Sequence, residues 1–110
     1  MSATTEKFEH PSDLVNAVLI AVTALPDGMF FRASTGVARP LGTTRVVRFN
    51  LPGTPDILGT FRGRSVGIEC KTGTGRLSAV QRTWRKNFLR SGGLYIEARS
   101  VQQVLAELGA

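Results

Sequence analysis

Three residues in the middle of the chain have the charges and the spacing that metal-assisted hydrolysis of a phosphate ester needs: Asp56, Glu69 and Lys71. Between Gly28 and Ile96, Asp56 and Glu69 are the only carboxylates, whereas the same stretch carries twelve Lys or Arg residues. A folded surface normally mixes charges of both signs, because unbalanced charge repels itself. Two isolated carboxylates in a basic region therefore predict a specific chemical role.

The strand-like segment 66–71 predicts how two of these side chains point. Side chains alternate along a strand, so every second residue shares a face. One face is apolar and is expected to pack on the core: Val66, Ile68 and Cys70. Glu69 and Lys71 then lie together on the opposite face. Asp56 begins the preceding predicted strand, and a hairpin between the two strands would bring it toward Glu69.

Two carboxylates that share a site repel each other, and each raises the pKa of the other. A divalent cation removes this penalty. Mg²⁺ prefers hard oxygen ligands and commonly binds one or two carboxylates together with waters and phosphate oxygens. Lys71 could orient the attacking water or stabilise the charge that develops on the phosphate. The residues alone leave open whether it acts as a base or as an electrostatic helper.

Four segments follow one another in an order that resembles the VRR-Nuc family of the PD-(D/E)XK nuclease superfamily. They are 53–59, 67–71, 75–81 and 92–95, and the similarity extends over about residues 53 to 105. The resemblance implies a PD-(D/E)XK restriction-endonuclease-like core and small stand-alone proteins of phage or bacterial type. It also implies a structure-selective DNA endonuclease, acting on branched DNA such as Holliday junctions, for which a symmetric homodimer is suited.

The resemblance further implies roles for individual residues. Asp56, Glu69 and the backbone carbonyl of Cys70 would hold Mg²⁺ or Mn²⁺, Lys71 would be the catalytic lysine, and Gln81 would face the active site. Some family members add a carboxylate from the first helix. Glu9 and Asp13 are the nearby candidates here, so the choice between one-metal and two-metal chemistry stays open.

The elements that must position these residues follow from periodicity and capping signals. A flexible tail, 1–10, precedes a single domain, 11–110. The expected elements are a helix over 13–25, strands over 29–32, 44–49, 56–61 and 66–71, a helix over 78–90, a strand over 94–98 and a helix over 101–108, with a loop over 33–43. Ser12, Ser78 and Ser100 are predicted to cap the three helices.

This order, α-β-β-β-β-α-β-α, predicts an α/β fold in which helices flank a small mixed β-sheet. The strand that carries Glu69 is expected to be central. The helix that begins at Ser78 should cross over to the strand at Leu94, so that the two strands run parallel.

Composition narrows the class of partner. The net charge of +6 favours an anionic partner, with nucleic acid the first choice. A single cysteine excludes an intrachain disulfide and suggests a reducing, cytoplasmic setting. No apolar run is long enough to span a membrane, and no nucleotide cofactor is expected. The predicted DNA contacts are basic residues near the site: Arg62, Arg76, Arg82, Arg85 and Lys86.

Simpler interpretations exist for each of these residues. Glu69 and Lys71 could form a weak ion pair on a solvated strand face. Gln81 could serve only to complete a capping box with Ser78, which is as well supported as a catalytic role. The whole chain could be a non-catalytic DNA-binding module, or an assembly protein that uses its basic face on an acidic partner.

Overall fold

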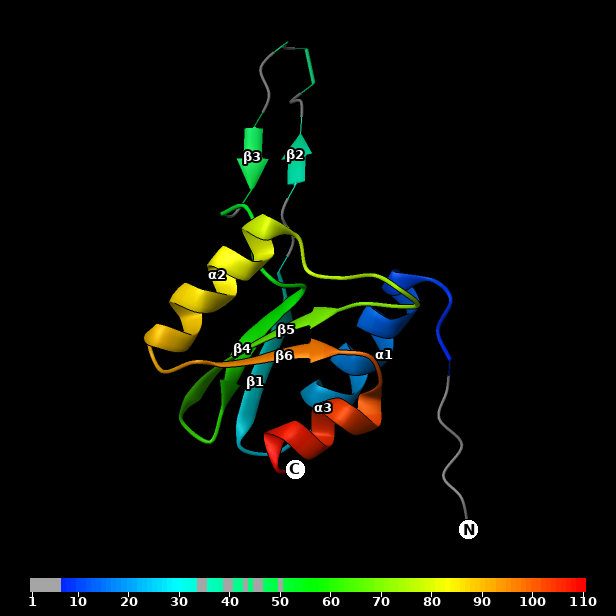
Figure 1. The fold of residues 1–110 in the computed structure, drawn as a ribbon, viewed down its shortest axis with the longest axis vertical. Helices are drawn as coiled ribbons and strands as arrows, with labels where there is room; N and C mark the ends of the chain where they lie inside the picture. The colour runs from blue at the N-terminus through cyan, green and yellow to red at the C-terminus, as the bar shows by residue number, and fades with distance from the viewer. Residues whose placement is uncertain (1–6, 34–35, 39–40, 43, 45–46, 50) are drawn as a thin grey trace.

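The computed structural model describes residues 7–33, 36–38, 41–42, 44, 47–49 and 51–110. These residues form an α/β domain with a four-stranded mixed sheet (Figure 1). The elements are α1 (Pro11–Thr23), β1 (Gly28–Arg32), β2 (Gly36–Ala38), β3 (Val47–Phe49), β4 (Ile57–Phe61), β5 (Arg64–Cys70), α2 (Ala79–Arg90), β6 (Leu94–Ala98) and α3 (Val101–Leu108). Of the helices in the described part, none has the length and apolar character to cross a membrane.

The main sheet has the strand order β1-β4-β5-β6. The pairs β1–β4 and β4–β5 are antiparallel, whereas β5 and β6 are parallel. Parallel strands need a long crossover, and α2 supplies it. The predicted crossover and the interior position of the strand that carries Glu69 are both confirmed.

A short strand replaces part of the predicted loop over 33–43. β2 lies in that segment and pairs antiparallel with β3, within the predicted strand over 44–49. The two form a separate hairpin that projects from the ends of β1 and β4 (Figure 1). Three residues are too few to show the alternation that identifies a strand, so only the pairing partner reveals β2. Within these two predicted segments, residues 34–35, 39–40, 43 and 45–46 lie outside the described part of the chain.

The first helix begins two residues earlier than predicted. Its N-cap is His10, whose Nδ1 accepts a hydrogen bond of 3.2 Å from the backbone N–H of Ser12. Pro11 takes the first helical position, where its missing N–H leaves no donor unsatisfied. The prediction of Ser12 as the cap was therefore wrong, and His10 has a structural role. Ser78 and Ser100 cap α2 and α3 as predicted.

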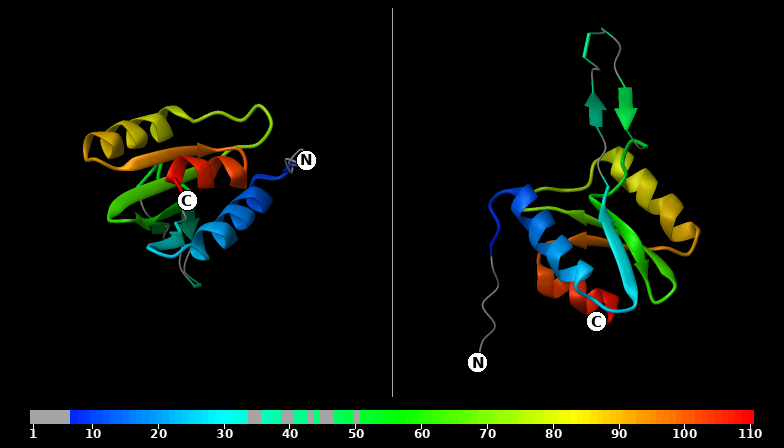
Figure 2. Two further views of the ribbon diagram at one scale, coloured as in Figure 1. Left: turned by 90° about the horizontal axis from the view of Figure 1, so that it is seen from below. Right: turned by 180° about the vertical axis from the view of Figure 1, so that it is seen from behind.

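The three helices divide between the two faces of the main sheet (Figure 2). α1 and α3 cover one face, and the main apolar core fills the space between. Its members include Leu14, Val18 and Val22 from α1, Val104 and Leu108 from α3, and Ile57, Val66, Ile68, Ile96 and Ala98 from the sheet. Burial of this surface is the dominant favourable term in folding.

The other face of the sheet is covered by α2 through a smaller set of contacts. A Cβ built on Gly67 of β5 would lie 3.4 Å from Trp84 and 3.5 Å from Phe88. The rings of Trp84 and Phe88 stack with their centroids 4.7 Å apart. Both side chains are half-buried, and α2 has no fully buried residue. Glu69 shares this face with Gly67.

Candidate active site

Asp56 and Glu69 lie opposite each other across two neighbouring strands. In the β4–β5 register, Ile57 stands opposite Ile68. The next position of the same register sets Asp56 against Glu69. Directly opposed residues on one face have Cβ atoms about 4.5–5.5 Å apart. Asp56 Oδ2 also accepts a hydrogen bond of 2.8 Å from the backbone N–H of Cys70, which holds the carboxylate beside the end of β5.

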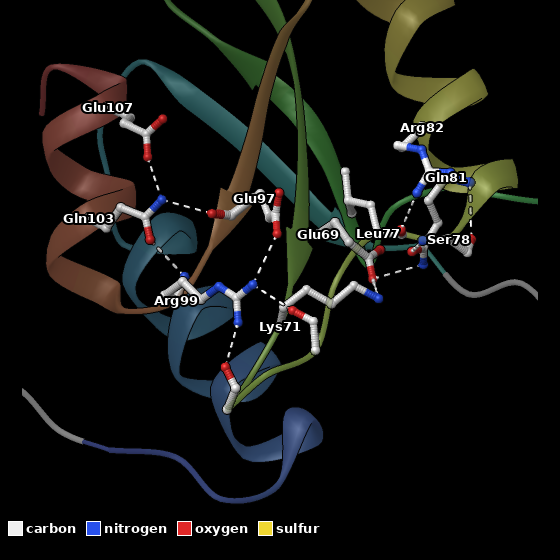
Figure 3. A network of polar contacts seen from close by, with 12 residues as sticks. Glu69, Lys71, Leu77, Ser78, Gln81, Arg82, Glu97, Arg99, Gln103 and Glu107 are labelled. Atoms are coloured by element: carbon white, nitrogen blue, oxygen red, sulfur yellow. Dashed lines mark hydrogen bonds and ion pairs between the residues drawn. The ribbon is translucent and has the colours of Figure 1, made fainter.

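Lys71 and Gln81 converge on the carboxylate of Glu69 (Figure 3). Lys71 Nζ lies 3.4 Å from Glu69 Oε2. Gln81 Nε2 donates a hydrogen bond of 3.2 Å to the same oxygen. Lys71 comes from the end of β5, whereas Gln81 comes from the first turn of α2, so the crossover brings the two donors together. Asp56, Glu69, Lys71 and Gln81 therefore form one cluster.

Glu69 is a buried carboxylate, with 5% of its surface exposed. Burial, followed by the negative charge of Asp56, raises the pKa of Glu69 to about 7. The nearby Lys71 opposes this rise by favouring the charged form. A solvated strand face would leave such a carboxylate exposed, so the interpretation of Glu69 and Lys71 as a surface ion pair does not describe this geometry.

Gln81 combines the two roles that its sequence position left open. Its Oε1 accepts a hydrogen bond of 2.9 Å from the backbone N–H of Ser78, and Ser78 Oγ accepts one of 3.2 Å from the backbone N–H of Gln81. This is a complete capping box. Because Oε1 serves the cap, Nε2 is oriented as a donor toward Glu69. Capping and site organisation are thus functions of one amide group.

The substitution Gln81→Glu is expected to separate these functions. It keeps an acceptor for Ser78 but replaces the donor that faces Glu69 by a second negative charge. We expect unfolding free energy to fall by roughly 1–3 kcal/mol at pH 8. The loss should be smaller at pH 5, where Glu69 is protonated and can donate. Chemical denaturation at both pH values measures this. Gln102→Glu, an exposed position in α3, is the control, and an equal loss in both variants would contradict the role of Gln81.

An open groove of about 810 Å³ lies beside Lys71. Its lining includes Glu9, Arg99 and the loop of residues 72–75. Of the two carboxylates proposed to join the site from the N-terminal region, Glu9 therefore lies along the same groove as Lys71. Asp13 is exposed in the first turn of α1 and is not part of this lining.

The predicted DNA contacts lie in three places. Arg76 is exposed in the loop before α2, and Arg82, Arg85 and Lys86 follow Gln81 on that helix. Arg62, by contrast, lies in the turn between β4 and β5, at the opposite end of β4 from Asp56. Six residue-to-residue steps separate them, which is about 20 Å in an extended strand. Arg62 therefore lies away from the cluster, whereas the other four residues lie within five positions of Gln81 in the chain.

Cys70 points away from the cluster, into the core between the sheet and α1. Burial raises the pKa of its thiol to about 12, so the thiol stays protonated at neutral pH. This agrees with the prediction of an apolar face made of alternate residues of β5. Its backbone N–H, in contrast, belongs to the cluster through the bond to Asp56.

Two charged residues beside the cluster were not singled out from the sequence: Glu97 and Arg99. Glu97 pairs in register with Glu69 across the parallel strands β5 and β6. Arg99 Nη2 donates a hydrogen bond of 3.1 Å to Glu97 Oε1. The sequence did contain a pattern that could have identified them, because Glu97-Ala98-Arg99 repeats the acid and base spacing of Glu69-Cys70-Lys71. Only the strand alignment shows that the two triplets lie side by side.

Comparison with known proteins does not assign the chain to a family. No family model matches it, and no curated protein matches it significantly.

Proposed function

We propose that this protein is a divalent-metal-dependent nuclease that hydrolyses DNA phosphodiester bonds. The observation that carries the proposal is the buried Glu69 carboxylate, which faces Asp56 and lies 3.4 Å from Lys71 Nζ. Protein interiors rarely hold a charged group unless it is paired or coordinates a metal. Two facing carboxylates and one lysine leave a net negative site, which suits a cation.

The chemistry of the donor set fits Mg²⁺ or Mn²⁺. Asp56 and Glu69 each present oxygens with about four lone-pair sites, so their existing hydrogen bonds leave capacity for a metal. The N–H and C=O of one strand residue point toward the same neighbour. Since the Cys70 N–H binds Asp56, its carbonyl is directed to the same side. When bound, the ion would lower the pKa of a coordinated water and offset charge on the phosphate.

No group of three or more His, Cys, Asp and Glu side chains is placed to hold a metal among the residues that the structure describes. The two carboxylates and the Cys70 carbonyl would therefore leave several coordination positions for water and phosphate. Mg²⁺ commonly binds proteins in this way, through one or two carboxylates with substrate phosphates. Glu9, which lines the same groove as the loop 72–75, is the candidate for a further ligand in a two-metal arrangement.

The remaining residues have roles that follow from their chemistry. Lys71 supplies a compact positive charge beside Glu69, where it can stabilise a phosphate oxygen or orient a water. Gln81 holds the Glu69 carboxylate in place from α2. Both donors bind Oε2, so Oε1 of Glu69 is the oxygen we assign to the metal.

DNA is the substrate class that the charge distribution favours. The chain has a net charge of +6, and Arg76, Arg82, Arg85 and Lys86 follow the cluster into and along α2. The first turn of α2 carries no acidic residue, so its positive dipole end also favours phosphate. Such contacts bind the backbone without reading sequence and weaken as salt rises.

Three finer predictions belong to the same proposal. The mixed sheet with its acidic strand ends is consistent with a PD-(D/E)XK core of VRR-Nuc type. That resemblance suggests selectivity for branched DNA, including Holliday junctions. A four-way junction has two equivalent cut positions, so a homodimer would suit it.

A panel of substrates tests the proposal. Linear duplex, single-stranded, flap and four-way DNAs are incubated with the purified chain and Mn²⁺, with Mg²⁺, or with EDTA. We expect cleavage with either metal, none in EDTA, and the highest rate on branched DNA. Asp56→Asn should remove the cleavage, whereas Asp27→Asn, an exposed position with φ of 66°, should not. Salt-sensitive binding without any metal-dependent cleavage would instead support a DNA-binding module.

A further inference from the structure

The ends of β5 and β6 carry matched pairs of opposite charge. The two strands are parallel, with Glu69 beside Glu97. On β5, Lys71 Nζ lies 3.4 Å from Glu69. On β6, Arg99 Nη2 lies 3.1 Å from Glu97. Each base thus neutralises the acid of its own strand, and the two pairs stand next to each other at the sheet end that holds the cluster (Figure 3).

Arg99 differs from Lys71 in reaching beyond its own strand. Its Nη1 donates a hydrogen bond of 3.1 Å to the carbonyl of Gly73, and its Nη2 donates one of 2.6 Å to the carbonyl of Gly75. Both carbonyls belong to the loop that begins directly after Lys71. The planar guanidinium has five donors in a fixed fork, which lets one side chain bind both carbonyls and Glu97 together.

The loop needs such an anchor, because its sequence favours many conformations. It reads Thr72-Gly73-Thr74-Gly75, and its last three residues are exposed. Glycine loses more backbone freedom on ordering than any other residue. The backbone N–H of Lys71 donates to the carbonyl of Ala98, which ties the start of the loop to β6. Arg99, the residue after Ala98, binds the loop at two further residues, Gly73 and Gly75.

The anchor is itself held by α3. Gln103 Oε1 accepts a hydrogen bond of 2.7 Å from the backbone N–H of Arg99. Its Nε2 donates to the backbone carbonyl of Glu97 at 2.8 Å and to Glu107 at 2.6 Å. Gln103 therefore does not close a capping box on Ser100, although their spacing would allow one, but fixes the end of β6. The chain of contacts runs from α3 through Arg99 to the loop after Lys71.

We infer that Arg99 is a positioning residue for the proposed nuclease site. It holds the loop 72–75 so that Lys71, at one end, keeps its place beside Glu69, and Arg76, at the other end, faces the DNA. This inference rests on the proposed function. Displacement of a reacting group by about 1 Å can lower a rate about a hundredfold. An anchor that keeps Lys71 in place can therefore control the rate without touching the substrate.

Arg64 provides a matched control for this role. It also binds two backbone carbonyls, with Nε 3.1 Å from the oxygen of Gly92 and Nη2 3.4 Å from that of Gly93. It lies at the first residue of β5, whereas the cluster lies at the other end of that strand. Arg64→Lys and Arg99→Lys therefore remove the same kind of two-carbonyl contact and keep the same charge.

The experiment compares Arg99→Lys, Arg99→Gln and Arg64→Lys with the unmodified chain. Single-turnover cleavage at saturating DNA should fall about ten- to a hundredfold in both Arg99 variants. The dissociation constant for DNA, measured in EDTA, should change less than threefold in Arg99→Lys. Amide hydrogen exchange over residues 72–76 should accelerate about tenfold or more in the Arg99 variants and stay unchanged in Arg64→Lys, for which cleavage should also be unchanged.

The outcomes test separately whether Arg99 holds the loop and whether that anchoring controls the cleavage rate. Unchanged exchange in the loop would show that Arg99 does not hold it. Faster exchange with an unchanged cleavage rate would overturn the positioning role, and so would an equal loss of rate in Arg64→Lys. If the unmodified chain cleaves no DNA, the proposed function fails and the catalytic part of the inference fails with it. The exchange measurement still decides whether Arg99 anchors the loop.

Discussion

Replacing Lys71 with methionine should lower the single-turnover rate of DNA cleavage by about 10² to 10³ at saturating substrate. Methionine keeps the apolar part of the side chain, which is largely buried, and removes only the amine that lies 3.4 Å from Glu69. A positive charge placed where negative charge develops in the transition state is among the largest contributions an enzyme makes. The fold should persist, because the core lies on the other face of the sheet.

Lys86→Met is the control for general loss of positive charge. Lys86 is exposed on α2, less than two helical turns after Gln81, and is one of the predicted phosphate contacts. Its loss should weaken binding and lower the slope of affinity against salt by about one, without changing the rate at saturation. A Lys71→Met chain that cleaves saturating DNA at the unmodified rate would remove Lys71 from the mechanism.

Glu69→Gln should make the metal-free protein more stable at pH 8 by roughly 1–3 kcal/mol, with little change at pH 5. The folded pKa of Glu69 is raised from 4.5 to about 7, so the folded state binds more protons than the unfolded state between these values. Stability from this group is therefore fully present below pH 4.5 and is lost as the pH rises through 7. Glutamine stays neutral and avoids that loss.

Divalent ions should reverse this order at pH 8. An ion that binds only the folded state stabilises it in proportion to the logarithm of its concentration above the dissociation constant. Mg²⁺ or Mn²⁺ should therefore stabilise the unmodified protein, and should stabilise Glu69→Gln far less. Denaturation curves at pH 5 and at pH 8, each with EDTA and with metal, compare the stability of the two proteins under all four conditions.

An exposed carboxylate supplies the control for the stability measurements. Glu107 is exposed near the end of α3, so Glu107→Gln should show neither the gain at pH 8 nor a loss of metal response. Equal metal stabilisation of the unmodified protein and of Glu69→Gln would place the ion elsewhere. If Glu69→Gln gained as much stability at pH 5 as at pH 8, burial of the charged carboxylate would not be the cause of the gain.

Local signals predicted most of the elements around the site. Ser78 and Gln81 close the predicted capping box at the start of α2. Strand β6 and helix α3 have the predicted bounds, and α3 ends at Gly109, with φ of 77°, as a glycine cap would. These features depend on hydrogen bonds and side-chain spacing within a few residues. The N-cap of α1 was misassigned because His10 competes with Ser12 at the same terminus.

The missed features depend on partners far along the chain. β2 is a strand only because β3 pairs with it, and both lie outside the main sheet. Glu97 joins the neighbourhood of Glu69 only because the α2 crossover aligns β6 parallel to β5. No periodicity within either segment encodes such a register, since register depends on the whole set of packed elements.

The amino-acid sequence by itself determined that Glu69 and Lys71 share a face, because side-chain alternation along an extended strand is a local property of the backbone. It also determined that this face is opposite the apolar one formed by Val66 and Ile68. Tertiary structure alone decided that Asp56 stands opposite Glu69 and that α2 brings Gln81 against Glu69. Those contacts, and the raised pKa of Glu69 that follows from burial beside a second charge, arise from segments that meet only when the chain folds.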